Sequence, residues 1–409
     1  MKFKVATLGC RTNQYESQGY ADLLRRKGYA EAGEGDADLC IVNTCTVTEG
    51  ADRSSRHQIR AFLRDHPGAR IAVTGCMVES AREELLALSP RVELVPNRTK
   101  ERLLEQILPE EGEWGPFQIN QFDRHSRAFV KVQDGCNSFC TYCVIPYVRG
   151  RSRSRPMGEI LEEVRGLVQG GYKEIVLTGI NVGDFDGGGR LADLVRAVDQ
   201  VEGLQRLRIS SIDPDEVDGE LMGAVLSGRT TCPSMHIVLQ SGSNVILKRM
   251  NRKYTRQQFL EAVDRLRSAR PDFTITTDVI VGFPGETEED FQETLRLVEE
   301  IRFAKVHVFP YSARPRTRAA LYPNRVPEET IARRKEELKR VAEESAYQLR
   351  EQFLNITASL LLEGEDEGCL SGYTPNFLRV FLPKGIGKPG EIVEVRLAAN
   401  GSEGFSGMV

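Results

Sequence analysis

The stretch that decides the fold is DGCNSFCTYC, residues 134–143, which places Cys136, Cys140 and Cys143 within one short loop. Three thiolates in the spacing CxxxCxxC can ligate three irons of a [4Fe–4S] cluster and leave the fourth iron open to a substrate or cofactor. A structural zinc site would need a fourth ligand to close it, and His125 lies too far along the chain to be an obvious one. The spacing therefore favours an iron–sulfur site.

The composition describes an ordinary globular chain of 409 residues, long enough for two or three domains. No run approaches the about eighteen apolar residues of a membrane span, and no secretory signal precedes the first strand-like run, so we expect a cytoplasmic protein without membrane contact. Nine cysteines, an odd number, favour reduced thiols over a disulfide framework. A net charge of −4 is not typical of a nucleic-acid binder, so any RNA contact must rely on local basic patches.

Three further cysteines, Cys10, Cys45 and Cys76, each follow the end of a short apolar run. Helical periodicity separates the runs, which predicts a parallel sheet whose strand ends share one edge. The three thiols should therefore converge, although 35 and 31 residues separate them in the sequence. Any one of them alone is more simply explained as a small core residue, as we expect for Cys40 inside its strand. Three equivalent positions favour a second three-thiolate site.

The central part of the chain alternates strand-like runs with helical stretches. The predicted strands span residues 128–132, 174–178, 207–212, 236–240, 274–281 and 305–309. Six βα units are too few to close an eight-stranded barrel, so we predict a partial (β/α)6 barrel. In barrels of this kind the C-terminal ends of the strands carry the active site.

The cysteine loop and its continuation, GCNSFCTYCVIP at residues 135–146, resemble the radical S-adenosylmethionine (SAM) enzymes of the methylthiotransferase branch. The runs LGC, NTC and TGC that end at Cys10, Cys45 and Cys76 are similar to the N-terminal domain of that family. TVT at residues 46–48 resembles the branch that acts on threonylcarbamoyladenosine in tRNA. The resemblance implies a SAM-cleaving [4Fe–4S] cluster on the loop and an auxiliary [4Fe–4S] cluster on the three separate cysteines.

The last part of the chain changes character after a charged helical stretch at residues 327–354. Short β-prone runs then suit a small β-barrel, a shape that often binds single-stranded RNA. GYTPNF at residues 372–377 resembles the TRAM domain of RNA-modifying enzymes. The predicted fold is therefore α/β throughout most of the chain, in three domains. These are a parallel-sheet α/β domain at residues 1–118, the radical SAM partial barrel at residues 122–345 and a TRAM β-barrel at residues 346–409.

The resemblance also implies which residues contact SAM, since glycine and short polar side chains at strand ends suit a polar ligand. The predicted cofactor-binding residues are Tyr142, Thr178, Gly179, Asn181, Ser211, Gln240 and Asp278. For any single polar residue among them, a hydrogen-bonded turn or cap is an equally simple explanation.

Candidate RNA contacts are of two kinds. Four arginines alternate closely after the cysteine loop, where such a run would grip phosphate, although a charge run is usually a solvated face. Two aromatic side chains of the last domain would stack on bases or, equally, pack in a core. The residues are Arg149, Arg151, Arg153 and Arg155, with Tyr373 and Phe377.

The resemblance implies one reaction. One SAM is cleaved to methionine and a 5′-deoxyadenosyl radical, and a second SAM methylates sulfur held at the auxiliary cluster. The methylthio group then replaces hydrogen at carbon 2 of N6-threonylcarbamoyladenosine at position 37, in the tRNA anticodon loop. An electron donor such as flavodoxin or ferredoxin and a sulfur donor are required. Open alternatives are isopentenyladenosine in tRNA, an aspartate of a ribosomal protein, and a non-catalytic iron–sulfur protein that binds RNA.

Overall fold

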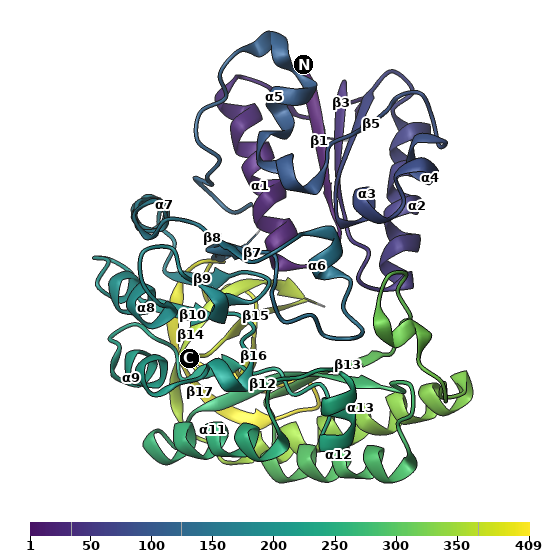
Figure 1. Cartoon of the computed structure of the whole chain (residues 1–409). Coiled ribbons are helices and arrows are strands. Elements are labelled where there is room, and N and C mark those ends of the chain that lie inside the picture. Colours follow the sequence, from purple (N-terminus) through teal and green to yellow (C-terminus); the bar gives the residue numbers. More distant parts are fainter. Residues whose placement is uncertain (34, 124, 367) are drawn as a thin grey trace. The chain divides into compact units, whose positions relative to one another are not determined.

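The computed structural model describes residues 1–33, 35–123, 125–366 and 368–409 (Figure 1). The chain divides into two compact units, and the three predicted domain ranges stay a prediction. Unit 1 consists of Met1–Asp123, Gln133–Arg153 and Ser312–Ala320. Unit 2 consists of Arg124–Val132, Ser154–Tyr311 and Leu321–Val409. The cysteine loop thus belongs to the compact unit of the N-terminal sheet.

Unit 1 is built on a five-stranded parallel sheet in the order β2-β1-β3-β4-β5. The strands are β1 (Lys2–Thr7), β2 (Ala30–Glu31), β3 (Leu39–Thr44), β4 (Arg70–Gly75) and β5 (Val92–Leu94). The predicted parallel α/β fold is confirmed, and the short strands β2 and β5 were not predicted. Cys40 is fully buried inside β3, as expected of a core residue.

Helices cover both faces of this sheet because alternate residues of β3 point to opposite sides. Leu39 and Ile41 pack in the core beneath α1 (Arg11–Arg26), whereas Cys40 and Val42 pack beneath α2 (Glu49–Asp65). Shorter helices complete the unit. These are α3 (Cys76–Ser80), α4 (Arg82–Leu86), α5 (Leu103–Ile107), α6 (Ile145–Val148), η1 (Asn97–Arg102) and η2 (Pro109–Glu111).

Unit 2 contains the predicted partial barrel, with six parallel strands in the order β6-β9-β10-β11-β12-β13. The strands are β6 (Arg127–Lys131), β9 (Glu174–Thr178), β10 (Arg206–Ile209), β11 (Ser234–His236), β12 (Thr274–Val281) and β13 (Lys305–Pro310). Backbone hydrogen bonds join the two three-stranded halves, from Ile212 N to His236 O at 3.1 Å and from Val238 N to Ile212 O at 3.0 Å. Two-residue strands, β7 (Gln133–Asp134) and β8 (Arg153–Ser154), border the cysteine loop.

Helices alternate with the barrel strands along the chain (Figure 1). They are α7 (Met157–Gln169), α8 (Leu191–Asp199), α9 (Gly219–Ser227), α10 (Asn244–Arg249), α11 (Arg256–Ala269), α12 (Glu288–Ile301) and α13 (Glu328–Glu351), with short turns η3 (Val182–Asp184), η4 (Pro214–Glu216) and η5 (Arg318–Leu321). Capping boxes at Thr255 and Thr287 begin α11 and α12. The domain boundary predicted between residues 345 and 346 falls inside α13. Among the helices of the described ranges, none has the length and apolar character needed to cross a membrane.

The chain ends in a closed antiparallel-rich barrel of five strands, in the order β14-β15-β16-β18-β17. Its strands are β14 (Thr357–Asp366), β15 (Cys369–Tyr373), β16 (Arg379–Leu382), β17 (Ile392–Asn400) and β18 (Phe405–Met408). The predicted small C-terminal β-barrel is therefore confirmed. Closure removes the exposed strand edges that an open sheet of this size would carry.

The small barrel packs against the N-terminal ends of the large-barrel strands through two buried arginines. Arg206 donates to the carbonyl oxygens of Tyr373 and Ser359, each at 2.8 Å. Arg208 donates to the carbonyl oxygens of Thr374 and Pro375, also at 2.8 Å. Guanidinium groups without water need such acceptors. Within unit 2, these bonds fix the C-terminal barrel to the large barrel.

One buried carboxylate balances the arginines at this junction. Glu174 has no exposed side-chain surface and pairs with Arg208 at 2.6 Å, Arg206 at 3.6 Å and Arg127 at 3.7 Å. Burial would raise the pKa of Glu174, but the three guanidinium groups, Arg208 foremost, outweigh burial and hold the pKa below its usual range. Glu174 therefore stabilises the fold above its unfolded-state pKa, and this contribution is lost as the pH falls through its depressed folded-state pKa.

Replacing Glu174 by Gln is expected to lower the free energy of unfolding by about 3–5 kcal/mol, because the buried guanidinium groups of Arg206 and Arg208 would lose their counter-charge. Urea titration at neutral pH measures the change. Glu220→Gln is the matched control, since Glu220 makes a 2.6 Å pair with Arg196 on the exposed surface, and its effect should be much smaller because water screens the pair. Equal effects of the two substitutions would contradict a structural role for the buried charge group.

Candidate active site

All nine cysteines are free thiols, and three of them follow neighbouring strands of the unit 1 sheet. Cys10 lies between β1 and α1, Cys45 directly follows β3, and Cys76 is the first residue of α3. Burial, with the nearby Cys76 adding to it, raises the pKa of Cys45 to about 12. Burial likewise raises the pKa of Cys76, and the nearby Cys10 raises this pKa further. The three predicted thiols thus follow neighbouring strands at one edge of the sheet, close enough to influence one another's ionisation.

Short polar contacts tie the three cysteine-bearing loops together. Asn13 Nδ2 donates to Leu8 O at 2.6 Å and to Thr44 O at 3.1 Å. The Thr44 hydroxyl donates to Thr74 O at 2.6 Å. Gly9 lies so close to Cys45 that an added Cβ would meet its Sγ at 2.8 Å. Three reduced thiols held on one such platform fit the donor set of a [4Fe–4S] cluster with one open iron.

The CxxxCxxC loop is also in unit 1 and is shaped by its own backbone. Cys136 N donates to Gly150 O at 3.1 Å, and Cys143 N donates to Cys140 O at 3.0 Å. Gly135 has φ +73°, and an added Cβ would lie 2.1 Å from Arg151 O, so only glycine fits there. The three cysteines are half-buried, and the fourth predicted residue of this loop, Tyr142, is half-buried beside them.

Arg149 is not placed as predicted. Its side chain has no exposed surface, so it cannot grip RNA phosphate, and this part of the predicted RNA contact is wrong. Arg149 Nε lies 3.3 Å from Cys76 Sγ, and Nη1 lies 2.7 Å from Asp134 Oδ1. Burial would lower the pKa of Arg149, but Asp134, Cys76 and Glu16 raise it well above its ordinary value, so the guanidinium stays charged.

The other three arginines of the run have different surroundings. Arg151 and Arg153 are exposed, and the Arg151 guanidinium lies 4.3 Å from the centre of the Phe139 ring. Arg155, in unit 2, donates to Lys131 O at 2.8 Å and pairs with Glu163 at 2.6 Å. Arg155 is thus already engaged within the fold, and the predicted RNA contact remains a prediction for Arg151 and Arg153.

The remaining predicted cofactor residues lie in unit 2, at or beyond the C-terminal parts of the barrel strands. Thr178 ends β9, Ser211 follows β10, and Gln240 follows β11. Gln240 N donates to Asp278 O at 2.8 Å, which brings two of them together. Within the described ranges, the buried Gln240 Oε1 and the Ser210 hydroxyl have no hydrogen-bond partner. Buried polar atoms without partners at this edge suit a polar ligand such as SAM.

A half-buried carboxylate that the sequence did not indicate, Glu216, supports the loop after β9. Asn181 Nδ2 donates to Glu216 Oε1 at 2.8 Å, and the half-buried Gly179 lies two residues before Asn181, directly after β9. Burial raises the pKa of Glu216 to about 7. Locally, Glu216 forms a capping box with Asp213, whose backbone N donates to Glu216 Oε2 at 3.3 Å, and this local pattern does not point to Asn181. Its proximity to Asn181 appears only in the folded chain.

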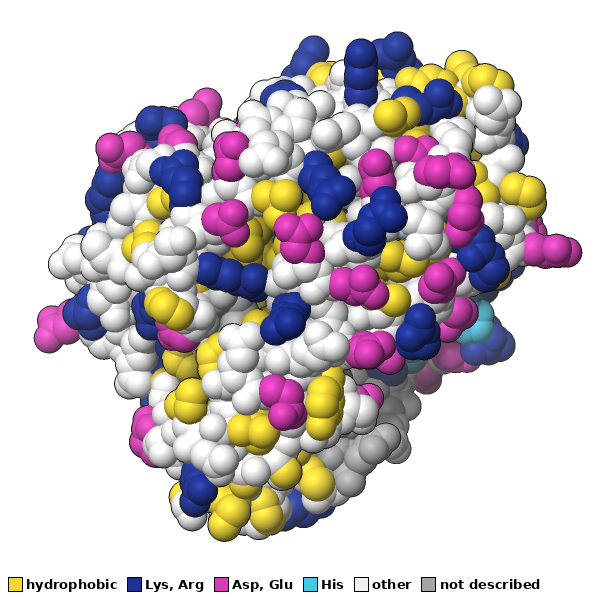
Figure 2. Space-filling model, turned by 90° about the horizontal axis from the view of Figure 1, so that it is seen from below, with side chains coloured by type: hydrophobic (Ala, Val, Ile, Leu, Met, Phe, Trp, Pro, Cys, Tyr) yellow, Lys and Arg dark blue, Asp and Glu magenta, His cyan; other side chains and the backbone are white. Residues whose placement is uncertain are grey.

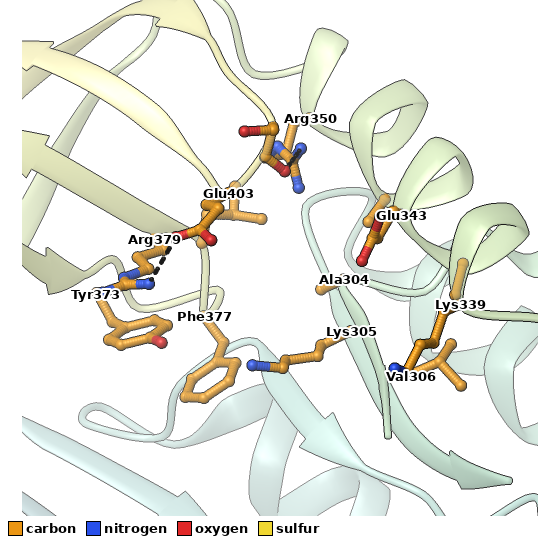
Figure 3. A pocket seen from close by; sticks show the side chains of 14 residues that line it. Ala304, Lys305, Val306, Lys339, Glu343, Arg350, Tyr373, Phe377, Arg379 and Glu403 are labelled. Carbon is orange, nitrogen blue, oxygen red and sulfur yellow. Dashed lines mark hydrogen bonds and ion pairs between the residues drawn. The ribbon is translucent and has the colours of Figure 1, made fainter. Parts of the chain in front are cut away.

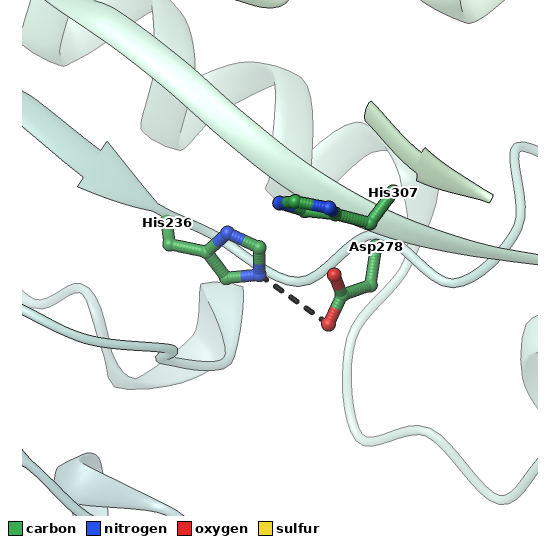
Figure 4. Close-up of side chains that lie close together, drawn as sticks. All are labelled: His236, Asp278 and His307. Atoms are coloured by element: carbon green, nitrogen blue, oxygen red, sulfur yellow. Dashed lines mark ion pairs between the residues drawn. The ribbon is translucent and has the colours of Figure 1, made fainter. Parts of the chain in front are cut away.

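Three polar side chains converge on the inner surface of β11, β12 and β13 (Figure 4). The ligand atoms of His236, Asp278 and His307 lie within 4.8 Å of one another. His236 Nε2 is 3.4 Å from Asp278 Oδ2, and His236 Nδ1 is 2.9 Å from the Thr276 hydroxyl. Two imidazoles and a carboxylate would suit a divalent cation, and they equally suit hydrogen bonds to a polar ligand. His307 was not predicted as a site residue. Side chains alternate along β13, so His307 lies on the same face of the strand as Lys305.

The predicted aromatic residues Tyr373 and Phe377 lie beside a cavity of about 390 Å³ within unit 2 (Figure 3). Their rings stack on each other with centres 4.6 Å apart, and the Arg208 guanidinium lies 5.2 Å from the Phe377 ring. Cationic residues, Lys305 and Arg379 among them, line the same cavity.

Lys and Arg side chains are interspersed with Asp and Glu side chains over the face shown in Figure 2. This mixture agrees with the small net charge of −4.

Comparison with known families and folds agrees with this architecture. The radical SAM superfamily model matches residues 130–298, and the model described as Uncharacterized protein family UPF0004 matches residues 2–96. Among solved structures, the radical SAM methyltransferase TsrM from Kitasatospora setae has a TM-score of 0.59 over 90% of this chain and 80% of its own, at 14% identity. The partial barrel and the family match together define a radical SAM enzyme.

Full-length relatives narrow the class. A Chlamydia pneumoniae protein named threonylcarbamoyladenosine tRNA methylthiotransferase MtaB is 48% identical, covering 100% of this chain and 98% of its own length. A Cereibacter sphaeroides protein named tRNA-2-methylthio-N(6)-dimethylallyladenosine synthase is 35% identical, covering 99% of this chain and 98% of its own length. The chain belongs to the radical SAM methylthiotransferase family. Its cofactors are accordingly SAM and two [4Fe–4S] clusters.

Gly135→Ala is expected to remove one cluster, because the new methyl group would collide with Arg151 O and unfold the cysteine loop. Anaerobic reconstitution followed by iron and sulfide analysis should find about four iron atoms fewer per chain. Gly28→Ala is the control, since Gly28 has a similar φ of +83° but open space around it. Full iron content in Gly135→Ala would show that the loop does not depend on this close approach.

The raised pKa of Glu216 predicts a pH dependence of stability. A carboxyl whose pKa rises from 4.5 to about 7 on folding stabilises the fold below its unfolded-state pKa, and this contribution is lost as the pH rises through 7. Each pKa unit corresponds to about 1.36 kcal/mol, so the loss is at most about 3 kcal/mol. Urea unfolding at pH 5 and pH 8 should show a smaller difference for Glu216→Gln than for the parent. An unchanged difference would exclude Glu216 as its source.

Proposed function

We propose that this enzyme adds a methylthio group to carbon 2 of N6-threonylcarbamoyladenosine at position 37 of tRNA. The observation that carries the proposal is the 48% identity, over the full length, to a relative named for that substrate. Relatives with the same name from Thermotoga maritima and Bacillus subtilis are each 37% identical. The product would be 2-methylthio-N6-threonylcarbamoyladenosine.

Two sets of three cysteines are the proposed cluster ligands. Cys136, Cys140 and Cys143 would hold the cluster that activates SAM. Cys10, Cys45 and Cys76 would hold the auxiliary cluster, whose binding platform is described above. When bound, the clusters supply electron transfer and a place for sulfur. The polypeptide supplies the ligand positions and limits the access of water to them.

The proposed SAM contacts follow from the polar edge of the large barrel. Gln240 and Ser211 would hydrogen-bond the ligand, and Gly179 would let the backbone approach it closely. Asn181, oriented by Glu216, would present its amide oxygen. Asp278 would accept from a ligand hydroxyl while His236 holds its other side. Thr178 would help close the pocket. Tyr142, on the cysteine loop of unit 1, stays a predicted SAM contact.

The proposed RNA contacts depend on exposed cations and rings rather than on net charge. Arg151 with Phe139 offers a cation and a ring beside the cysteine loop, which suits a phosphate and an unstacked base. Arg153 extends this surface. Tyr373 and Phe377 remain candidate stacking residues at the cavity in unit 2. An anticodon loop offers splayed bases that fit such sites.

Two further partners and the cellular location are part of the proposal. The chemistry requires an external electron donor, such as flavodoxin or ferredoxin, and a sulfur donor. The cytoplasmic location expected from the sequence also stays a prediction.

The alternative substrate with direct support is isopentenyladenosine in tRNA, because relatives named for dimethylallyladenosine are 33–35% identical over the full length. The difference of identities favours the threonylcarbamoyl substrate. The aspartate of a ribosomal protein and a non-catalytic RNA-binding role remain alternatives that the same experiment separates.

The decisive experiment is mass spectrometry of nucleosides from tRNA incubated anaerobically with reconstituted enzyme, SAM, sulfide and reductant. We expect 2-methylthio-N6-threonylcarbamoyladenosine with the parent protein and none with Cys140→Ala, which lacks one proposed cluster ligand. Appearance of the isopentenyl product alone would contradict the substrate assignment. Formation of 5′-deoxyadenosine with unmodified tRNA would direct the search to a protein substrate, and absence of both products would favour the non-catalytic alternative.

A further inference from the structure

Four buried charges form a closed group within unit 1, and none of them was predicted to have this role. Arg149, Glu16, Lys100 and Asp134 have side chains that are at most 7% exposed. Lys100 Nζ lies 2.7 Å from both Glu16 Oε1 and Asp134 Oδ2. Arg149 Nη1 lies 3.3 Å from Glu16 Oε1 and 2.7 Å from Asp134 Oδ1. Two cations thus balance two carboxylates.

We propose that Arg149 is a positioning residue that tunes the auxiliary cluster by donating a hydrogen bond to the Cys76 thiolate. This inference rests on the ligand set given in the proposed function, namely Cys10, Cys45 and Cys76. Arg149 Nε lies 3.3 Å from Cys76 Sγ, and Nη2 donates to Asn13 Oδ1. The same Asn13 oxygen lies 3.7 Å from Cys10 Sγ. One guanidinium therefore contacts Cys76 directly and also holds Asn13, whose side-chain oxygen accepts from the free Cys10 thiol.

The direction of the effect follows from charge. Reduction adds an electron to a cluster, and a hydrogen bond to a ligating sulfur stabilises the more negative state. A buried cation at the same distance acts in the same direction because the surroundings screen it weakly. Arg149 therefore raises the reduction potential of the auxiliary cluster. Its removal would leave Lys100 facing two carboxylates, a buried net charge of about −1, which lowers the potential further.

The same guanidinium connects the auxiliary site to the CxxxCxxC loop. Its partner Asp134 accepts a hydrogen bond from Gly135 N at 2.8 Å, directly before the first cysteine of that loop. Arg149 itself lies six residues after Cys143. Rigid, charge-assisted bonds on both sides hold the start of the loop and Cys76 in a fixed relation. A flexible lysine could not make these contacts simultaneously, since it lacks the planar fork.

The test compares three full-length variants after anaerobic reconstitution. Arg149→Gln removes the charge. Arg149→Lys keeps the charge but lacks the planar guanidinium group with its several N–H donors. Arg64→Gln is the matched control, because Arg64 is exposed on α2 and pairs with the adjacent Asp65 at 2.8 Å. Each is also made with Cys136→Ala, Cys140→Ala and Cys143→Ala, so that only the auxiliary site can be loaded. Potentiometric titration followed by electron paramagnetic resonance measures the midpoint potential.

We expect Arg149→Gln to lower the midpoint potential so that the ratio of reduced to oxidised cluster at a fixed potential falls about tenfold, which is about 59 mV for one electron. Arg149→Lys should shift it in the same direction by less, and Arg64→Gln should not shift it. If Arg149→Gln fails to hold iron, Arg149→Lys decides the question. Midpoints of both Arg149 variants equal to that of the parent, at equal iron content, would overturn the inference.

The readout does not involve tRNA, so it separates this inference from the proposed function. Suppose the protein makes the methylthio nucleoside, but its midpoint potential does not change when Arg149 is substituted. This result would refute the inference and leave the proposed function intact. A protein whose midpoint responds to Arg149, but which leaves tRNA unmodified, supports the inference and refutes the substrate assignment. Retention of the auxiliary cluster in Cys76→Ala would remove the ligand assignment on which the inference rests.

Discussion

The constraint on which the structure depends is that neighbouring parallel strands end at the same edge of a sheet. In unit 1, Thr7 of β1 is paired with Asn43 of β3, and Asn43 is paired with Thr74 of β4. Cys10, Cys45 and Cys76 follow this row by three, two and two residues. Hydrogen-bond register alone therefore gathers three thiols from distant parts of the sequence, and no local motif is needed to specify them.

The same constraint gives the two ends of the large-barrel strands different chemistry. At their N-terminal ends, Arg206 and Arg208 are satisfied by Glu174 and by carbonyl oxygens of the small barrel. At their C-terminal ends, buried polar atoms such as Gln240 Oε1 lack a partner among the described residues. One end is thus a completed internal junction, and the other retains hydrogen-bonding capacity for a ligand.

Strands and cysteine sites could be predicted because periodicity and spacing in the sequence encode them. Side-chain environments that depend on contacts between distant parts of the chain could not be predicted. Six barrel strands and three strands of the N-terminal sheet were located by apolar runs, while β2, with only two residues, carries no readable pattern. The alternation of arginines suggested a solvated or RNA-binding face for Arg149. Its burial depends on Glu16, which is 133 residues away in the sequence. Glu216 was missed for the same reason, since its partner Asn181 is 35 residues away.

Unit 1 is assembled from three separate stretches of the chain, and the last of them ends at Ala320. Residues 312–320 contribute a buried arginine, Arg314, which pairs with Asp52 and donates to Thr46, the residue after Cys45. During synthesis the N-terminal sheet emerges first, yet its native contacts are complete only after more than three quarters of the polypeptide has been made. The contacts of Arg314 beside Cys45 are therefore a late addition to unit 1 during synthesis, and they close a loop of more than 260 residues.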